Sequence, residues 1–186
     1  MQLTLLEHLR LTFGHVVHRH RVHAELAHSS ARWSRRLRML EALWMVAVAY
    51  TAAAAAFNKG QAYALASAIL AGFALVTFVI HLTIDLDVSA QTHGICAGRM
   101  WLIRERYRAL LADLVDGAVD LDAARRGRDT LMTEMHAIYE RAALLDHESY
   151  RATAPRLTTI DDVPISDEEI DQLLPKSLQK AGKSAA

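Results

Sequence analysis

Two long apolar runs dominate the sequence. Residues 40–57 carry one acidic residue, Glu41 at their start, and residues 62–84 contain no Asp, Glu, Lys or Arg over 23 residues. The four residues between them leave room only for a tight antiparallel turn. At about 1.5 Å per residue, the first run covers roughly 27 Å, just short of the ~30 Å hydrocarbon layer of a bilayer, and the second is long enough to cross it. Two core helices of a soluble protein are the alternative, but neither run has the polar face they would need, so the pattern predicts a transmembrane hairpin.

The residues before the hairpin follow a helical period. Thr4-x-x-Glu7 matches a capping box, the sequence signature of a helix N-terminus. Apolar residues follow at helical spacing: Leu6, Leu9, Phe13 and Val16, continued less regularly by Val22, Leu26, Trp33 and Leu37. The sequence therefore predicts an amphipathic helix that continues directly into the first span.

Two further amphipathic helices are predicted after the hairpin. The apolar stripe of the first is Met100, Ile103, Tyr107, Leu110, Leu111 and Leu114. A turn from Asp116-Gly117 to Asp122 separates it from the second, whose stripe is Leu131, Met135, Ile138, Ala142 and Leu145 and which ends by Ala154-Pro155. A short acidic helix opens at Ser166-x-x-Glu169, and disorder is predicted from Lys176 onward. Each stripe must pack on its neighbours, on the N-terminal helix or across subunits.

These elements predict an all-α membrane protein with a two-helix transmembrane hairpin and long cytoplasmic helices that form a bundle, oligomeric in state. The expected domains are a basic amphipathic helix at 1–38, the hairpin at 39–85 with spans at 40–57 and 62–84, a cytoplasmic helical hairpin at 86–155, and an acidic short helix with a disordered tail at 156–186.

Charge sets the expected orientation. The formal net charge is +0, from 21 basic and 21 acidic residues, so no global basic field favours direct nucleic-acid binding. Seven arginines precede the hairpin and several follow it, whereas the turn carries only Lys59. The positive-inside rule then places both termini in the cytoplasm and the turn outside. The single cysteine, Cys96, leaves no disulfide framework, and no secretory signal is evident.

An aromatic and basic belt precedes the first span, where lipid headgroups are expected to lie. Its residues are Trp33, Arg35, Arg36 and Arg38. Within the spans, small residues recur every four positions, a spacing that lets helices approach closely in lipid. These candidate packing residues are Ala47, Thr51 and Ala55 in the first span and Ala64, Ala68 and Gly72 in the second.

A polar stripe follows another face of the second span. Its members are Ser67, Thr77, His81 and Asp85, with Ala74 between them and Asp87 beyond. Ionisable groups at membrane depth usually face protein or water, so these residues are candidates for lining a pore in an oligomer. The alternative is that Thr77 and His81 form hydrogen bonds within one chain, while Asp85 and Asp87 lie at the membrane interface.

Other chemistry is weakly indicated or lacking in the sequence. Six histidines precede the hairpin (His8, His15, His18, His20, His23 and His28), and their spacing allows a metal site or a pH sensor. A solvated polar face is the simpler interpretation, because no cysteine or carboxylate cluster accompanies them. Nucleotide-binding glycine patterns, zinc-protease motifs and a nucleophile elbow are missing, so neither an enzyme nor a cofactor is expected.

The layout resembles the SLATT family of two-span effectors from bacterial conflict systems, over residues 5–155. The resemblance rests on the basic N-terminal helix with Trp33-Ser34-Arg35-Arg36, on the tight hairpin, and on the run of residues 104–111, Arg-Glu-Arg-Tyr-Arg-Ala-Leu-Leu. It implies an inner-membrane effector of antiphage defence that oligomerises and permeabilises or depolarises the membrane on activation. It supplies no catalytic residues. Because no fused nucleotide-sensing domain is recognisable, a separately encoded sensor or activator is the expected partner, besides membrane lipids and further copies of the chain.

Two functions are therefore weighed. The polar stripe and the small-residue faces favour a pore-forming effector. The alternative is a non-conducting membrane scaffold, whose hairpin is only an anchor and whose cytoplasmic helices recruit a partner.

Overall fold

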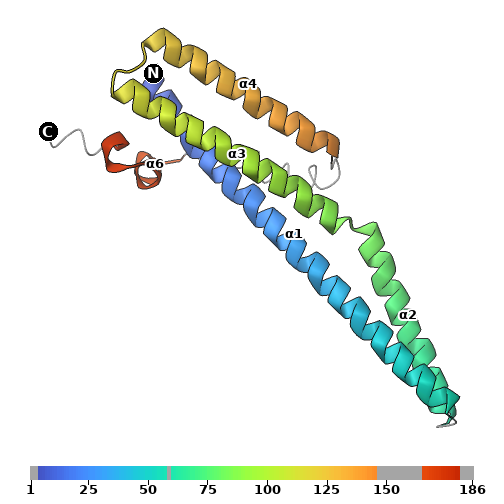
Figure 1. Cartoon of the computed structure of the whole chain (residues 1–186). Helices are drawn as coiled ribbons and strands as arrows, with labels where there is room; N and C mark the ends of the chain where they lie inside the picture. The colour runs from blue at the N-terminus through green and yellow to red at the C-terminus, as the bar shows by residue number, and fades with distance from the viewer. Residues whose placement is uncertain (1–3, 58–59, 146–164, 181–186) are drawn as a thin grey trace. The chain divides into compact units, whose positions relative to one another are not determined.

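The computed structural model describes residues 4–57, 60–145 and 165–180, and of residues 142–145 only the backbone. The described residues form helices and turns, without any strand. The helices are α1 (Leu5–Ala56), α2 (Gln61–Thr83), α3 (Leu86–Val115), α4 (Leu121–Leu145), α6 (Asp167–Leu173) and the 3₁₀ turn η1 (Lys176–Leu178) (Figure 1). The predicted all-α fold is confirmed for these residues.

The chain divides into two compact units. The hairpin unit is Ala27–Gln91, and the core unit is Met1–Leu26 together with Thr92–Ala186. Both α1 and α3 contribute residues to each unit, since the divisions fall within these helices. Within the hairpin unit, polar contacts continue the helix pairing past the two apolar runs, and the expected hairpin bounds of 39–85 stay a prediction. Ser30 and Ser34 contact Ser89 and Asp87, respectively.

The predicted continuous first helix is confirmed. α1 runs for 52 residues from Leu5. Its first turn has the expected capping box: the Thr4 backbone N–H donates to Glu7 Oε2 (3.1 Å), and the Glu7 N–H donates to Thr4 Oγ1 (3.3 Å). These hydrogen bonds hold the pKa of Glu7 below its ordinary value. The start of α1 is thus determined locally, by contacts between residues three positions apart.

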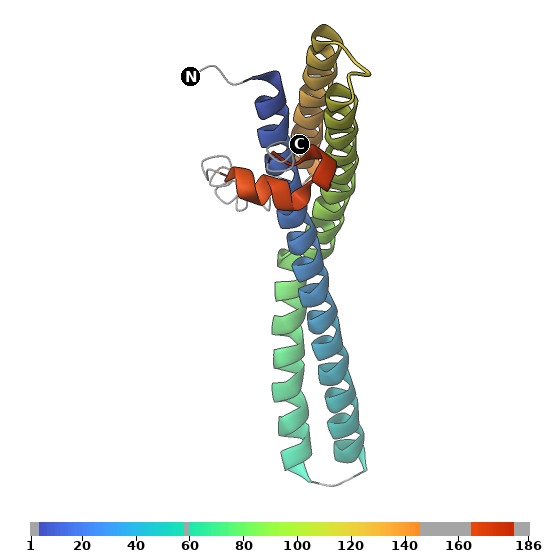
Figure 2. The same ribbon diagram turned by 90° about the vertical axis from the view of Figure 1, so that its left-hand side faces the viewer.

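The second apolar run forms a helix close to the expected bounds. Gly60 precedes α2 with φ 104°, a left-handed conformation that favours glycine. α2 ends where Ile84 becomes extended (φ −105°, ψ 95°), and α3 starts two residues later, with the Ser89 N–H donating to the Asp85 carbonyl oxygen. A break in the helical backbone therefore bounds α2 at each end, at Gly60 beside the turn and at Ile84 before α3. Figure 2 shows the antiparallel pairing of α2 with the second half of α1.

The core unit buries the central residues of the stripes that the sequence predicted, whereas Trp33 is 56% exposed and the side chains of Ala142 and Leu145 lie outside the described residues. From α1 the core takes Leu9, Phe13, Val16 and Val17; from α3 it takes Met100, Ile103, Tyr107 and Leu111; from α4 it takes Leu131 and Ile138. An ion pair between Arg106 and Glu134 (2.5 Å) also joins α3 to α4. The expected turn between them contains Gly117 at φ 70°, and the Asp120 side chain caps α4 by accepting from the Ala123 N–H (2.6 Å).

The C-terminal segment, residues 165–180, differs in part from the expectation. α6 opens with the predicted capping box of Ser166 and Glu169. The sequence predicted disorder over 176–186, but the structure forms η1 at its start and packs Leu178 against the core, while residues 181–186 lie outside the described residues. The reason is tertiary, since Ile170 and Leu174 are almost fully buried in the core and hold the segment in place. The predicted end of the long helix near Ala154-Pro155 lies outside the described residues.

Candidate functional site

The hairpin unit exposes its apolar side chains. Large residues on both helices are more than half exposed, for example Val46 at 69% on α1 and Leu65 at 64% on α2. No side chain of α2 is buried. α1 and α2 are each long and apolar enough to cross a membrane. In water such a surface would be far larger than monomeric proteins tolerate, so it requires lipid or another chain.

Polar side chains lie between the two helices of the hairpin unit. Glu41 Oε1 of α1 lies 2.9 Å from His81 Nδ1 of α2, and the two side chains are about 20% exposed, at 20% and 21%. When Glu41 is ionised, the Nδ1–H of His81 donates this hydrogen bond, and a protonated imidazole would convert it into an ion pair. The contact satisfies two groups that are expensive to leave unpaired in an apolar setting.

The polar contacts continue beyond the apolar runs. The hydroxyl of Ser34, a residue with no exposed surface, donates to Asp87 Oδ1 (2.7 Å), and Arg38 pairs with the same oxygen (3.2 Å). Farther along, the hydroxyls of Ser30 and Ser89 lie 3.5 Å apart. We call these contacts, with that of Glu41 and His81, the polar seam.

Helix geometry explains why these residues meet. Ser30, Ser34, Arg38 and Glu41 follow one another at three- and four-residue intervals, which places them on one face of α1. In an antiparallel hairpin, residues at similar distances from the turn lie opposite each other. Glu41 is about as far before the turn as His81 is after it. The seam is therefore a property of spacing on two helices and not of any local motif.

The predicted pore-lining residues lie in different environments. Ser67, Thr77 and His81 are half-buried on α2, and Asp85 is exposed at the break before α3. The Thr77 hydroxyl donates to the Phe73 carbonyl oxygen (2.9 Å), so Thr77 and His81 make the hydrogen bonds within one chain that the alternative interpretation expected. Whether the stripe lines a pore in an oligomer stays a prediction.

The two candidate packing faces differ in their exposure. Ala47, Thr51 and Ala55 of α1 are half-buried, whereas Ala64, Ala68 and Gly72 of α2 are exposed. A Cβ at Gly72 would meet no atom within 4 Å. Within one chain, the second set does not make the hairpin contact. Packing of that face between chains stays a prediction.

The interfacial belt is exposed, as a headgroup contact requires. Trp33 is 56% exposed, and the Arg36 guanidinium lies 5.3 Å from the centre of its ring. Arg35, Arg36 and Arg38 are exposed, and Arg38 also joins the polar seam through Asp87. Cations stacked on an aromatic ring near the end of an apolar span suit the interface between lipid and water.

The histidines of the core unit do not form a uniform solvated face. His23 of α1 has no exposed surface, and its Nδ1 lies 3.0 Å from Nδ1 of His93 on α3. Burial lowers the pKa of His23 to about 4, helped by the positive charges of His93, Arg19 and His20, and burial likewise lowers the pKa of His20. Over the described part of the chain, no three His, Cys, Asp or Glu residues are placed to hold a metal ion.

Sequence reasoning missed the partners in these contacts. Glu41 was notable only as the single acid of the first run, and Asp87 only as an interfacial residue. Their distances from the turn, compared with those of His81 and Ser34, are the signal that could have paired them. No comparable signal marked His23 and His93, which are 70 residues apart in the chain.

These features define an α-helical protein with an exposed apolar hairpin, in which Glu41, His81 and Ser34 make polar contacts between its helices. The family model of the SMODS and SLOG-associating 2TM effector domain, family 4, matches residues 5–169. The chain belongs to this family, which confirms the resemblance inferred from the sequence and associates the chain with a membrane as a two-span effector. Neither the curated proteins nor the solved structures include a match to the chain.

Proposed function

We propose that this chain is an effector of bacterial antiphage defence that assembles with further copies of itself in the inner membrane and permeabilises or depolarises it on activation. The observation that carries the proposal is the polar seam inside the exposed apolar hairpin. Family membership supports a membrane effector of conflict systems. A hairpin that served only as an anchor would not need a carboxylate and an imidazole between its helices.

The seam supplies what a conducting state requires. The exposed outer face must contact lipid or neighbouring hairpins, and the small residues Ala64, Ala68 and Gly72 on that face allow close approach of another helix. If the two helices separate, Glu41 and His81 become available to water and to ions. We therefore place the resting state with the seam closed and the conducting state with the seam open.

The charge pattern supports an orientation. Arginines precede the first span and follow the second, which by the positive-inside rule favours cytoplasmic termini and an external turn. The core unit is then available to a cytoplasmic sensor or activator encoded separately. A cysteine at Lys59, in a Cys96→Ala background, should react with an impermeant thiol reagent in intact cells. A cysteine replacing the exposed Asp122 should react only after lysis.

The function is tested by membrane potential and dye uptake on induced expression. Glu41→Gln removes the charge from the Glu41–His81 contact and His81→Leu removes the contact itself, and we expect both to change depolarisation at equal membrane abundance. Glu25→Gln, an exposed glutamate on the same helix, is the matched control. Unchanged depolarisation in both seam variants would remove the seam from the mechanism. An intact potential with every variant, even with the activator present, would reject permeabilisation.

One observation favours the scaffold alternative. The core unit leaves Trp101 and Leu102 of α3 about half exposed, at 49% and 47%, which a bound partner would cover. Replacing residues 40–84 with an unrelated two-span anchor separates the two functions. A scaffold keeps its activity after this replacement, whereas a permeabilising effector loses it.

A further inference from the structure

The C-terminal segment docks on α1 by specific contacts. Ile170 and Leu174 are 2% and 4% exposed and belong to the same apolar core as Leu9 and Phe13. Gly14 permits the approach, because a Cβ at that position would lie only 3.1 Å from Ile170 Cγ1. The absence of a side chain at one position of α1 therefore makes room for α6.

Charged groups fasten the segment at two points. The buried guanidinium of Arg10, 3% exposed as a residue, donates to the Asp171 carboxylate and to the Leu178 carbonyl oxygen, so one side chain holds both α6 and η1. Lys180 Nζ lies 2.8 Å from Asp167 and 3.5 Å from Glu7 of α1. These contacts raise the pKa of Lys180, with the Asp167 hydrogen bond the largest cause.

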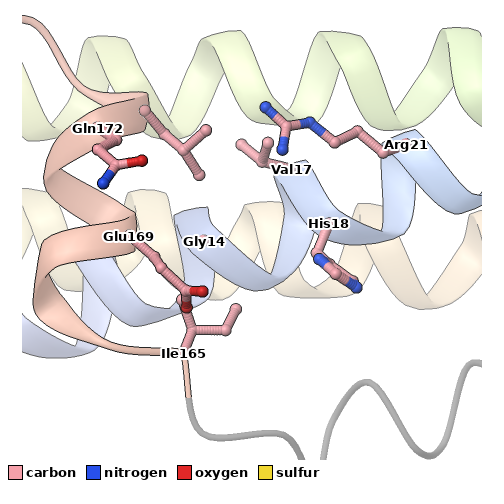
Figure 3. A pocket seen from close by; sticks show the side chains of 8 residues that line it. Gly14, Val17, His18, Arg21, Ile165, Glu169 and Gln172 are labelled. Atoms are coloured by element: carbon pink, nitrogen blue, oxygen red, sulfur yellow. The ribbon is translucent and has the colours of Figure 1, made fainter.

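Solvent-accessible pockets border the same segment. A pocket of about 400 Å³ lies between α1 and α6, with Gly14, Val17, His18 and Arg21 on one side and Glu169 and Gln172 on the other (Figure 3). A second pocket of about 470 Å³ lies between α3 and the η1 region. Water can therefore reach the edges of the docked segment. Seven residues of α6 are also too few for a helix that is stable alone, so its order depends on docking.

The segment docks on α1, the helix that also contains the first apolar span. α1 continues without a break from the residues that bind the segment, around Arg10 and Gly14, to the apolar residues of the first span. Asp171 and Lys180 lie past residue 169, where the family match ends, so family membership does not account for this clasp.

We propose that the C-terminal segment is a releasable autoinhibitory strap: docked on α1 it holds the chain in its resting state, and its release is required before the membrane is permeabilised. This inference rests on the proposed function and adds its regulation. Release exposes the face of α1 around Gly14, which Ile165 and Ile170 cover in the docked state. A resting contact of this kind must be specific yet breakable, which matches a seven-residue helix held by a few ion pairs and two buried apolar side chains.

Two opposite variants of the full-length chain in liposomes test the strap. Gly14→Leu places a side chain where Ile170 lies and should displace the strap. Gly98→Leu is the matched control, because nothing lies within 4 Å of a Cβ at that helical glycine. Gly14→Cys with Ile170→Cys, in a Cys96→Ala background, should lock the strap through a disulfide, since the 3.1 Å approach suits a sulfur at the Cγ1 position.

We expect Gly14→Leu to release entrapped dye at least fivefold faster than wild type, and Gly98→Leu to match wild type. The lock should suppress release at least tenfold when oxidised and recover it on reduction. Strap displacement is measured separately by thiol alkylation of a single Ile170→Cys, which should react about tenfold faster in the Gly14→Leu chain than in the Gly98→Leu chain.

The outcomes separate the strap from the function. Equal dye release by the oxidised and the reduced lock would overturn the strap and leave permeabilisation intact. Gly14→Leu that is alkylated quickly but releases no dye would also overturn it, provided that the wild-type chain depolarises cells. If no variant releases dye and the wild-type chain does not depolarise cells even with the activator present, permeabilisation itself is rejected, and the strap's regulatory role with it.

Discussion

The two halves of α1 differ in where their large apolar side chains lie. In the core unit, Leu9, Phe13 and Val16 point inward and are almost fully buried, as expected for a helix in water. In the hairpin unit, Leu43, Val46 and Tyr50 of the same helix are about two-thirds exposed, at 66%, 69% and 67%, while Ser34 and Glu41 face the partner helix. One unbroken helix therefore reverses its apolar and polar faces.

The surroundings explain this reversal. In water, burying apolar surface stabilises the fold, so the core unit gathers its large side chains inside. In lipid, burial of apolar side chains inside the protein brings no hydrophobic stabilisation, whereas polar groups need hydrogen-bond partners within the protein. The exposure pattern of the hairpin unit therefore suits lipid, and that of the core unit suits water.

The largest effect that tests this comparison is expected in the core unit. Phe13→Ala removes a side chain that is 2% exposed, and it should lower the free energy of unfolding by about 3–5 kcal/mol. Met132→Ala, at a position 44% exposed on α4, should change it by less than about 1 kcal/mol. Thermal unfolding of the detergent-solubilised chain, monitored by circular dichroism, measures both. Similar losses would mean that Phe13 lies in no tight core.

A charge on the outer face of the hairpin distinguishes lipid from water. Gly72→Arg places a cation on the exposed side of α2, which costs about 3 kcal/mol at the centre of a bilayer and almost nothing in water. We expect it to reduce the membrane-bound fraction, whereas Gly72→Leu, the matched control, should not. Sedimentation of membranes followed by quantification of the chain gives the result. Equal membrane fractions for the two variants would contradict a lipid-facing surface.

The buried histidine pair predicts a pH dependence confined to the core unit. His23 has its pKa lowered from 6.5 to about 4, so the unfolded chain binds more protons than the folded chain between these values. Its contribution to stability is complete above about pH 6.5 and is lost as the pH falls toward 4. Between pH 7 and pH 5 the loss is roughly 2 kcal/mol.

His23→Gln should flatten this dependence, while His28→Gln at an exposed position should retain it. Melting temperatures of the wild type and both variants from pH 7.5 to pH 5 provide the comparison. An equally steep decline in His23→Gln would assign the pH sensitivity to other groups.

The smallest effect concerns Tyr107. Its hydroxyl is buried without a hydrogen-bond partner among the described residues, and burial raises its pKa to about 12. Tyr107→Phe removes the unsatisfied group and should stabilise the core unit by about 1 kcal/mol. Chemical denaturation of both chains measures the difference. A destabilised variant would indicate that the hydroxyl has a partner in the folded chain.

The sequence by itself determined where the helices lie and which face of each core helix is apolar. The capping boxes at Thr4 and Ser166, the turn at Gly117 and the stripes around Met100 and Leu131 were all predictable, because each depends on residues a few positions apart. The length and apolarity of residues 62–84 likewise predicted a membrane helix from local composition alone.

Only the tertiary structure decided which faces meet. Periodicity places Glu41 and His81 on faces of their helices, but it does not say which face turns toward the partner, and the Ala64, Ala68 and Gly72 face could equally have done so. The contact of Arg10 with Asp171 spans 161 residues, and no local pattern encodes it. Such pairings arise because burial brings distant polar groups together and each must then find a partner.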